Sequence, residues 1–142
     1  DGDHPDILEF VRCKAAEGEF EIVPTWIDVY RSEDNGATWK YLNRPVPDAG
    51  SGGNPPAMIK LQDGRICLTY GYRAAPFGIR ARLSEDGGKT WGEVIHLRDD
   101  GGCSDLGYPR TVQRPDGVIV TTYYFNDDPD TERFIGATLW TP

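Results

Sequence analysis

The chain has 142 residues, 38% of them hydrophobic and 27% charged, with a formal net charge of −8 at pH 7. This length allows one domain with a buried core, and no apolar run approaches the roughly 18 residues that a membrane helix needs. The charge excludes nucleic acid as a partner, because phosphates are bound by clusters of Lys and Arg. It also repels anions at long range, so an anion site must rely on local arginines.

Seventeen Gly and eleven Pro are spread along the chain, which favours many short strands joined by turns over a helical protein. The sequence starts at Asp1 with no Met and no signal-peptide apolar segment, so we expect a trimmed product or a fragment.

Ten strands are predicted in chain order, in three groups. The central group has four strands, with the turn Gln62-Asp63-Gly64 between the first two, where Asp and Gly tolerate positive φ. A group of three precedes it and another three follow. The ranges are Ile7–Arg12, Phe20–Arg31 and Thr38–Leu42; then Ala57–Leu61, Arg65–Tyr72, Gly78–Leu83 and Thr90–Leu97; then Thr111–Gln113, Val118–Phe125 and Arg133–Trp140.

The strands belong to an internal repeat. SEDNGATW at 32–39 recurs as SEDGGKTW at 84–91, 52 residues later, and PAMIKLQDGRICLTYGYR at 56–73 recurs as PRTVQRPDGVIVTTYYFN at 109–126, displaced by 53. Two independent motifs with nearly one period indicate a structural repeat of four antiparallel strands. The sequence therefore predicts an all-β protein, a partial β-propeller of about two and a half blades over residues 1–142.

Each octet carries a carboxylate, at Asp34 and at Asp86. Ser and Asp side chains accept hydrogen bonds from turn backbone, Gly36 and Gly88 permit a left-handed residue, and the octet Trp can pack between strands. Because the octets recur with the period of the fold, we expect a structural role and not a catalytic one.

The octets are similar to the Asp box (BNR repeat) S-x-D-x-G-x-T-W. The segments FGIRARLSEDGGKTW and DLGYPRTVQRPDGVIVTTYYF resemble the C-terminal blades of the sialidase (neuraminidase) superfamily. That resemblance implies a carbohydrate-active propeller, glycoside hydrolase-like and specific for an acidic sugar. In that family three arginines bind the sugar carboxylate, a Tyr–Glu pair supplies the nucleophile and an Asp is the acid/base. A neutral phenol attacks an anionic substrate better than a carboxylate that would repel it.

The resemblance places Tyr108 at the nucleophile position and Arg80 at the third clamp arginine, with Arg73 as its rival, because a guanidinium binds a carboxylate bidentately. Asp105 is either an acid/base or a turn residue. Tyr108 alternatively packs on Pro109, and either arginine alternatively pairs between blades. Tyr123, Tyr124 and Phe125 are predicted to lie in the core.

The set implied for an exo-sialidase-like hydrolase is incomplete. Pro109-Arg110 stands where sialidases usually carry Ser, and the strand after the hairpin ends in Tyr123-Tyr124-Phe125-Asn126, whereas sialidases often end it in Tyr-Glu. The first clamp arginine and the acid/base Asp belong to blades this chain lacks. The carboxylates that remain for the Tyr are Glu9, Glu17, Glu19 and Glu21, and nothing selects among them.

No metal or other cofactor is expected. His4 and His96 stand alone, and the cluster Asp127, Asp128, Asp130 lacks regular calcium-ligand spacing, so we favour a solvated turn. Cys67 lies in an apolar run and is predicted to be a buried thiol, whereas Cys13 and Cys103 are either free or joined in a disulfide. The family resemblance favours an extracytoplasmic or secreted protein.

Two other functions stay open. One is a non-catalytic propeller module that presents loops to a glycan or a protein. In the other, unpaired blade edges recruit a second copy, and a symmetric homodimer of two and a half blades each would close a five-bladed ring.

Overall fold

The computed structural model describes residues 7–14, as backbone only, and residues 24–142. None of the described residues belongs to a helix that is long and apolar enough to cross a membrane. The described chain forms ten strands: β1 (Ile7–Lys14), β2 (Thr25–Ser32), β3 (Lys40–Val46), β4 (Ala57–Lys60), β5 (Ile66–Tyr72), β6 (Phe77–Ser84), β7 (Ile95–Gly101), β8 (Gly107–Gln113), β9 (Ile119–Phe125) and β10 (Phe134–Trp140).

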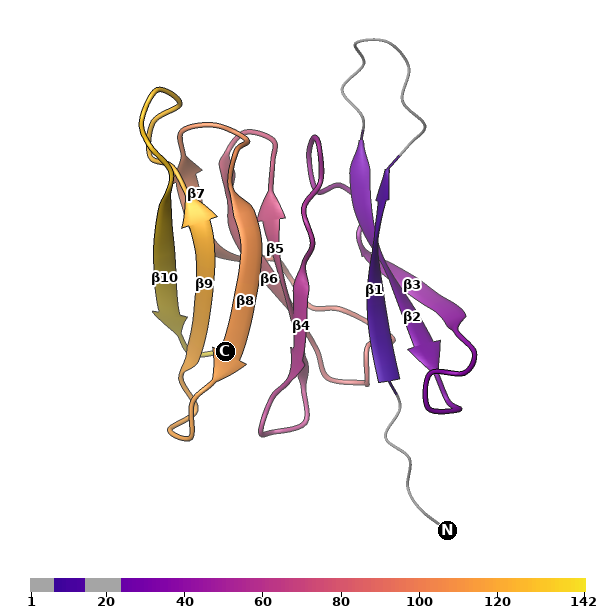
Figure 1. Cartoon of the computed structure of the whole chain (residues 1–142). Helices are drawn as coiled ribbons and strands as arrows, with labels where there is room; N and C mark the ends of the chain where they lie inside the picture. The colour runs from indigo at the N-terminus through magenta and orange to yellow at the C-terminus, as the bar shows by residue number, and fades with distance from the viewer. Residues whose placement is uncertain (1–6, 15–23) are drawn as a thin grey trace.

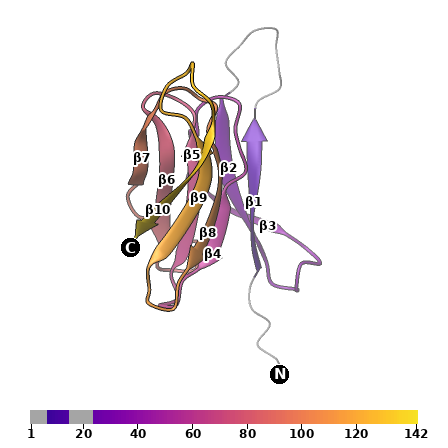
Figure 2. The ribbon, with the colours of Figure 1, turned by 60° about the vertical axis from the view of Figure 1, so that its left-hand side comes forward.

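The strands form three antiparallel sheets, each an up-and-down meander in chain order: β1-β2-β3, β4-β5-β6-β7 and β8-β9-β10. The sheets lie one after another across the molecule, with the four-stranded sheet in the middle (Figures 1 and 2). This confirms the predicted all-β fold class and the grouping of strands. Each sheet is one blade, and the blades are called first, second and third below.

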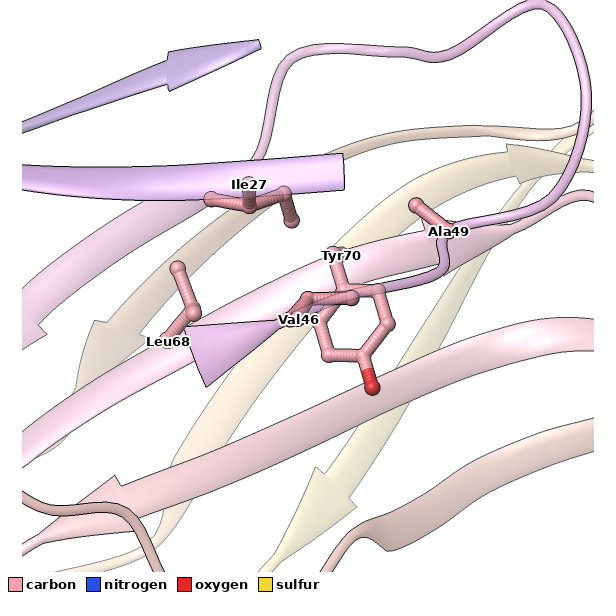
Figure 3. Packing of buried hydrophobic residues seen from close by; sticks show 5 residues of the cluster. All are labelled: Ile27, Val46, Ala49, Leu68 and Tyr70. Atoms are coloured by element: carbon pink, nitrogen blue, oxygen red, sulfur yellow. The ribbon is translucent and has the colours of Figure 1, made fainter. Parts of the chain in front are cut away.

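The core lies between the faces of neighbouring blades. Ile27 and Val46 of the first blade pack with Leu68 and Tyr70 of the second, and Ala49 from the connecting loop completes this cluster (Figure 3). Two further clusters join the second blade to the third. Apolar side chains therefore hold the blades face to face, since strand alternation gives each sheet two faces to bury.

The second interface contains hydroxyl groups as well as apolar side chains. The Thr69 hydroxyl on β5 lies 2.7 Å from that of Thr111 on β8, which lies 3.2 Å from that of Thr121 on β9. Trp140 donates its ring N–H to Thr121 over 3.1 Å. Buried hydroxyls need partners, and these three satisfy one another across the interface.

The octets fold as turns that bond to themselves. The Ser32 hydroxyl accepts the Gly36 N–H at 2.7 Å, and Asp34 accepts the Thr38 N–H at 2.8 Å. Ser84 and Asp86 repeat these bonds at 2.8 Å each, with Gly88 and Thr90 as donors. The structural role predicted for the octets is thus visible in their hydrogen bonds.

Several strand boundaries differ from the sequence prediction, among them the end of β3, predicted at Leu42 and observed at Val46, and two of the differences lie close to the octet turn and to Tyr108. The fourth strand of the second blade was predicted to start at Thr90, but β7 starts at Ile95, because Gly92 still bonds to the Leu83 carbonyl and extends the octet turn. The first strand of the third blade was predicted to start at Thr111, but β8 starts at Gly107, and a register shift follows between Gly107 and Arg110. Tyr108 therefore lies inside β8 and not before it.

The two octet tryptophans, Trp39 and Trp91, differ from each other in their packing. Trp91 packs against the core between the first two blades and donates its ring N–H to Asn43 of the first blade over 3.1 Å. Trp39 is 37% exposed. Among the residues whose side chains are described, Trp91 packs between blades, whereas Trp39 belongs to none of the core clusters.

Other expectations concern side chains outside the described part of the chain: His4, the four glutamates at positions 9, 17, 19 and 21, and Cys13. Within it, Cys67 is a buried free thiol and Cys103 is also free. Burial raises the pKa of the Cys67 thiol to about 12, so this residue is an unreactive core group.

Candidate functional site

The loops β5–β6, β7–β8 and β9–β10 gather at one end of the blades, and the octet turns lie at the other (Figure 1). The candidate residues Arg73, Asp105 and Tyr108 all lie at the loop end. Arg73 follows β5, Asp105 lies between β7 and β8, and Tyr108 is the second residue of β8.

Tyr108 has an unusual backbone. Its φ is +50°, in the left-handed region that non-glycine residues seldom adopt. Its N–H donates to Asn54 Oδ1 at 3.1 Å, and its side chain is 47% exposed. The phenol is thus presented to solvent from a constrained backbone.

Arg73 lies behind Tyr108, with its guanidinium carbon 5.8 Å from the centre of the Tyr108 ring. Its Nε donates to the Leu106 carbonyl at 2.9 Å, and its Nη1 donates to the Gly53 carbonyl at 3.3 Å. Its Nη2 donates to the Tyr124 hydroxyl at 2.8 Å. Two backbone acceptors fix the guanidinium, and Tyr124 is its side-chain acceptor.

Tyr124 joins Arg73 to Asp105. Its hydroxyl donates to Asp105 Oδ1 at 2.8 Å, and Arg133 Nε donates to Asp105 Oδ2 at 2.8 Å. The centre of the Tyr124 ring lies 5.6 Å from the centre of the Tyr108 ring. The result is a continuous row of polar contacts from Arg73 through Tyr124 and Asp105 to Arg133.

The pKa values along this row diverge. Burial, and then the hydrogen bond to Asp105, raise the pKa of Tyr124 to about 12. The hydrogen bonds from Tyr124 and Arg133 lower the pKa of Asp105. At neutral pH Asp105 is ionised and Tyr124 is a neutral donor. A carboxyl group whose pKa is lowered is a poor proton donor and also a weak base, because an effective acid/base has a pKa near the working pH.

The loop that carries Asp105 is anchored by the fully buried side chain of Asn126. Asn126 accepts the Cys103 N–H at 2.9 Å and donates to the Asp105 carbonyl at 2.8 Å. Asp105 therefore lies in an ordered turn with its carboxylate facing Tyr124, and an acid/base role for it stays a prediction.

Two hollows lie beside Arg73, Tyr108 and Tyr124. A cavity of about 460 Å³ is lined by Arg73, Phe77, Asp48, Ser51 and Ser104, among others. A smaller hollow of about 240 Å³ is lined by the Tyr108 and Tyr124 side chains with Arg110 and Thr122. An aromatic surface beside hydroxyl, carboxylate and guanidinium groups is typical of small polar ligand sites.

Arg80 lies elsewhere. Its neighbour Ile79 packs toward the third blade with Leu106, so Arg80 points to the opposite face of the sheet. There its guanidinium carbon lies 3.3 Å from the centre of the Tyr72 ring, and Tyr72 packs against the core between the first and second blades. The structure thus brings Arg73, and not Arg80, to Tyr108.

The acidic cluster of the β9–β10 loop forms a turn. Asp128 accepts the Asp130 N–H at 2.9 Å, and Asp127 pairs with Arg98 at 3.2 Å. Among the described residues no group of three His, Cys, Asp or Glu side chains is arranged to hold a metal ion.

Sequence reasoning missed four residues of this site: Tyr124, Arg133, Asn54 and Asn126. Tyr124 was assigned to the core with Tyr123 and Phe125. Only the latter two are buried there, since Tyr124 lies on the other face of the strand. The displacement of 53 pairs Asn126 with Arg73 and was the one signal in the sequence for a special position after β9.

No protein-family model matches the sequence, and no curated protein matches it. Solved structures do match it. A protein of unknown function from Dyadobacter fermentans DSM 18053 is 27% identical, with a TM-score of 0.56, over 97% of this chain and 50% of that one.

An α-L-arabinanase of Penicillium chrysogenum complexed with arabinobiose is 19% identical, with a TM-score of 0.60, over 82% of this chain and 42% of that one. An ulvan lyase bound to -[GlcA(1-4)Rha3S]- is 19% identical, with a TM-score of 0.62, over 87% of this chain and 30% of that one. The chain thus spans half the length of the first of these proteins and less of the others. At this identity the likeness shows the fold: the chain is about two and a half blades of a β-propeller.

Proposed function

We propose that this chain contributes the sugar-binding end of a carbohydrate-active β-propeller, glycoside hydrolase-like and directed at an acidic sugar. The row Arg73–Tyr124–Asp105 beside the exposed phenol of Tyr108 carries this proposal. It combines a fixed cation, a carboxylate and an aromatic surface at the loop end of the blades.

Arg73 is suited to an anion because one of its acceptors is exchangeable. Two nitrogens are held by backbone carbonyls, whereas Nη2 donates to the neutral Tyr124 hydroxyl. A ligand carboxylate that replaces this hydroxyl gains a charge-assisted hydrogen bond. Tyr124 meanwhile keeps Asp105 as its acceptor.

Two of the structural neighbours were solved with carbohydrate ligands, which supports a sugar as the class of ligand proposed here. The arabinanase was solved with arabinobiose, and the ulvan lyase with an oligosaccharide whose repeat contains an acidic sugar, GlcA. These ligands belong to those proteins and motivate the choice of sugars to test here. A sialidase-like specificity is the finer form of the proposal, with Tyr108 as the nucleophile and Arg73 in place of Arg80 as the clamp arginine.

Calorimetric titration with sialic acid, glucuronic acid and neutral arabinobiose tests the proposal. We expect the acidic sugars to bind, and Arg73→Lys to weaken their binding about 10-fold, since Lys lacks the planar fork that contacts two backbone carbonyls and the ligand at once. Arg114→Lys is the matched control, because Arg114 forms an exposed pair with Asp116 in the β8–β9 hairpin at the other end. Stronger binding of the neutral sugar, or equal losses in both variants, would count against it.

A non-catalytic glycan-binding module is the second candidate. One observation favours it: Asp105 is held by Tyr124 and Arg133, and among the described residues no carboxylate is bonded to the Tyr108 phenol. Hydrolysis of a fluorogenic sialoside or glucuronide separates the two candidates. Turnover that Tyr108→Phe abolishes supports the enzyme, and binding without turnover supports the module.

We also propose that a second copy covers the outer face of the third blade and thereby borders the smaller hollow, which Ile135 lines together with Tyr108 and Tyr124. On this face Val112, Ile135 and Leu139 are 61%, 78% and 59% exposed, whereas the equivalent face of the second blade is covered by the third. Two copies also match the length of the Dyadobacter protein. Each copy has one blade of four strands and two of three strands. Its ten strands amount to about two and a half blades but occupy three blade positions, so two copies would occupy six positions and not the five expected from counting strands. Light scattering at several concentrations distinguishes a dimer from a monomer.

A further inference from the structure

Tyr108 is held in its unusual conformation from outside its own blade. Asn35 and Tyr108 are the described non-glycine residues with positive φ, +58° and +50°. Asn35 lies in an octet turn, where Asn adopts such angles readily. A Tyr inside a strand does not, and it persists only when its surroundings fix it.

Asn54 is the group that contacts this backbone. It lies in the loop before β4 and is only 4% exposed. Its Oδ1 accepts the Tyr108 N–H at 3.1 Å, and its Nδ2 donates to the Gly71 carbonyl at 3.4 Å. One buried amide thus links β5, an inner strand of the second blade, to Tyr108 in the third.

Two glycines make room for that amide. A Cβ at Gly71 would lie 2.8 Å from the Asn54 amide atoms, and a Cβ at Gly107 would lie 2.4 Å from its oxygen. Real Cβ atoms essentially never approach so closely. Gly107 is itself at φ +124°, so the two residues entering β8 are both left-handed. The chain is shaped around the Asn54 side chain on both sides.

We propose that Asn54 is the positioning residue for Tyr108: its buried amide holds Tyr108 in the left-handed conformation that sets the phenol over Arg73. The site on the third blade is thereby formed by its contact with the second. The conformational part of this inference stands alone, and only its effect on ligand affinity rests on the proposed function.

Comparing Tyr108→Gly with Tyr108→Ala by denaturant unfolding tests the conformation. Both variants lack the phenol, but only glycine tolerates positive φ without strain. In an ordinary strand Ala is the more stable of the two. With Asn54 in place we expect the reverse, a folded-to-unfolded ratio roughly 2- to 5-fold higher for Gly than for Ala. Ala equal to or better than Gly would overturn the proposal.

The same pair in an Asn54→Ala background tests the cause. Without the acceptor the backbone can relax, so the preference for Gly should disappear. Asn54→Asp keeps an acceptor of the same shape and should retain the preference, and it supplies the comparison if Asn54→Ala does not fold. An undiminished preference in Asn54→Ala, or its loss in Asn54→Asp, contradicts the role of the amide oxygen.

The ligand measurement uses a matched control at the octet end. Asn43 likewise links two blades, by donating to the Gly88 and Lys89 carbonyls at 2.6 and 2.8 Å. We expect Asn54→Ala to lower acidic-sugar affinity about as much as Tyr108→Ala, whereas Asn43→Ala lowers stability only. Unchanged affinity in Asn54→Ala would contradict the positioning role. If the wild type binds no sugar, the proposed function fails, and the Gly/Ala comparison alone decides the role of Asn54.

Discussion

Tyr124 shows how one hydroxyl organises the candidate site. It accepts from Arg73 and donates to Asp105, both at 2.8 Å, so it separates a guanidinium from a carboxylate that would otherwise pair directly. This arrangement keeps Arg73 exchangeable toward a ligand. Arg133, on the far side of Asp105, neutralises the remaining charge.

We expect Tyr124→Phe to remove a phenol titration with a raised pKa and to lower stability by about 1–2 kcal/mol, since the lost hydrogen bonds involve charged groups. The pKa of Tyr124 is raised from 10.0 to about 12. Its contribution to stability is therefore complete below pH 10 and is lost as pH rises toward 12. Near-ultraviolet absorbance titration of both proteins measures this. A wild-type titration that Tyr124→Phe leaves unaltered would show that the burial and the Asp105 bond are not as described.

At the scale of elements, the octets close the turns between third and fourth strands with side chains from the turn itself. The Asp86 carboxylate accepts from Ser84, Lys89 and Thr90, and these bonds lower its pKa to about 2. Asp34 repeats the contacts with Ser and Thr, here Ser32 and Thr38, and its pKa is likewise lowered to about 2. A catalytic carboxylate is needed once in an active site, whereas a carboxylate that closes a turn is needed in every blade that has the turn.

Asp86→Ala should therefore lower the melting temperature and leave sugar affinity unchanged. Because the folded-state pKa is depressed from 3.8 to about 2, the stabilisation from Asp86 is present above about pH 4 and is lost as pH falls to 2. Thermal melts across that range should converge for wild type and variant at the acid end. A loss of affinity with no change in melting temperature would refute the structural role.

The interface between the second and third blades depends on buried hydroxyls. Thr111→Val removes the group that joins Thr69 to Thr121 and should cost about 1–3 kcal/mol, because two buried hydroxyls lose a partner. Thr122→Val is the control: Thr122 is on the exposed face of β9, where substitutions usually change stability by less than about 0.5 kcal/mol. Denaturant unfolding of the two variants gives the comparison, and equal losses would contradict the assignment.

At the scale of the whole molecule, the third blade presents an apolar face without a covering blade among the described residues. Ile135 is its most exposed large apolar residue, at 78%. Exposed apolar side chains gathered on one sheet face, here with Arg110 and Thr122 between them, are typical of interaction surfaces. The first and second blades show what covers such a face, since each is packed against the next blade in the chain.

Ile135→Asp should abolish self-association and leave the monomer's melting temperature within about 2 °C of wild type, because an exposed side chain contributes little to monomer stability. Light scattering on a sizing column at several concentrations provides the readout. A wild type that is monomeric at every concentration would contradict the proposed second copy, as would an Ile135→Asp variant that still dimerises.

The local structural features of this protein could be predicted from its sequence. The hairpin at Asp63-Gly64, the octets and the period of 52 to 53 residues depend on contacts within a few positions of the chain, so short-range propensity and hydrogen bonding specify them. These features predicted an all-β propeller of about two and a half blades, and the strand grouping in the structure agrees.

The composition of the site was decided by the tertiary structure. Arg73 and Arg80 belong to the same blade, and the sequence does not distinguish them. Arg73 donates a hydrogen bond to the Tyr124 hydroxyl of the third blade, whereas Arg80 stacks on Tyr72 on the side of the first blade. Which face of a strand is buried, and against what, depends on the packing of whole sheets, which alternation along one strand does not encode. Tyr108 owes its conformation to Asn54, 54 residues away in sequence, and only the packing of one blade on the next brings the two together.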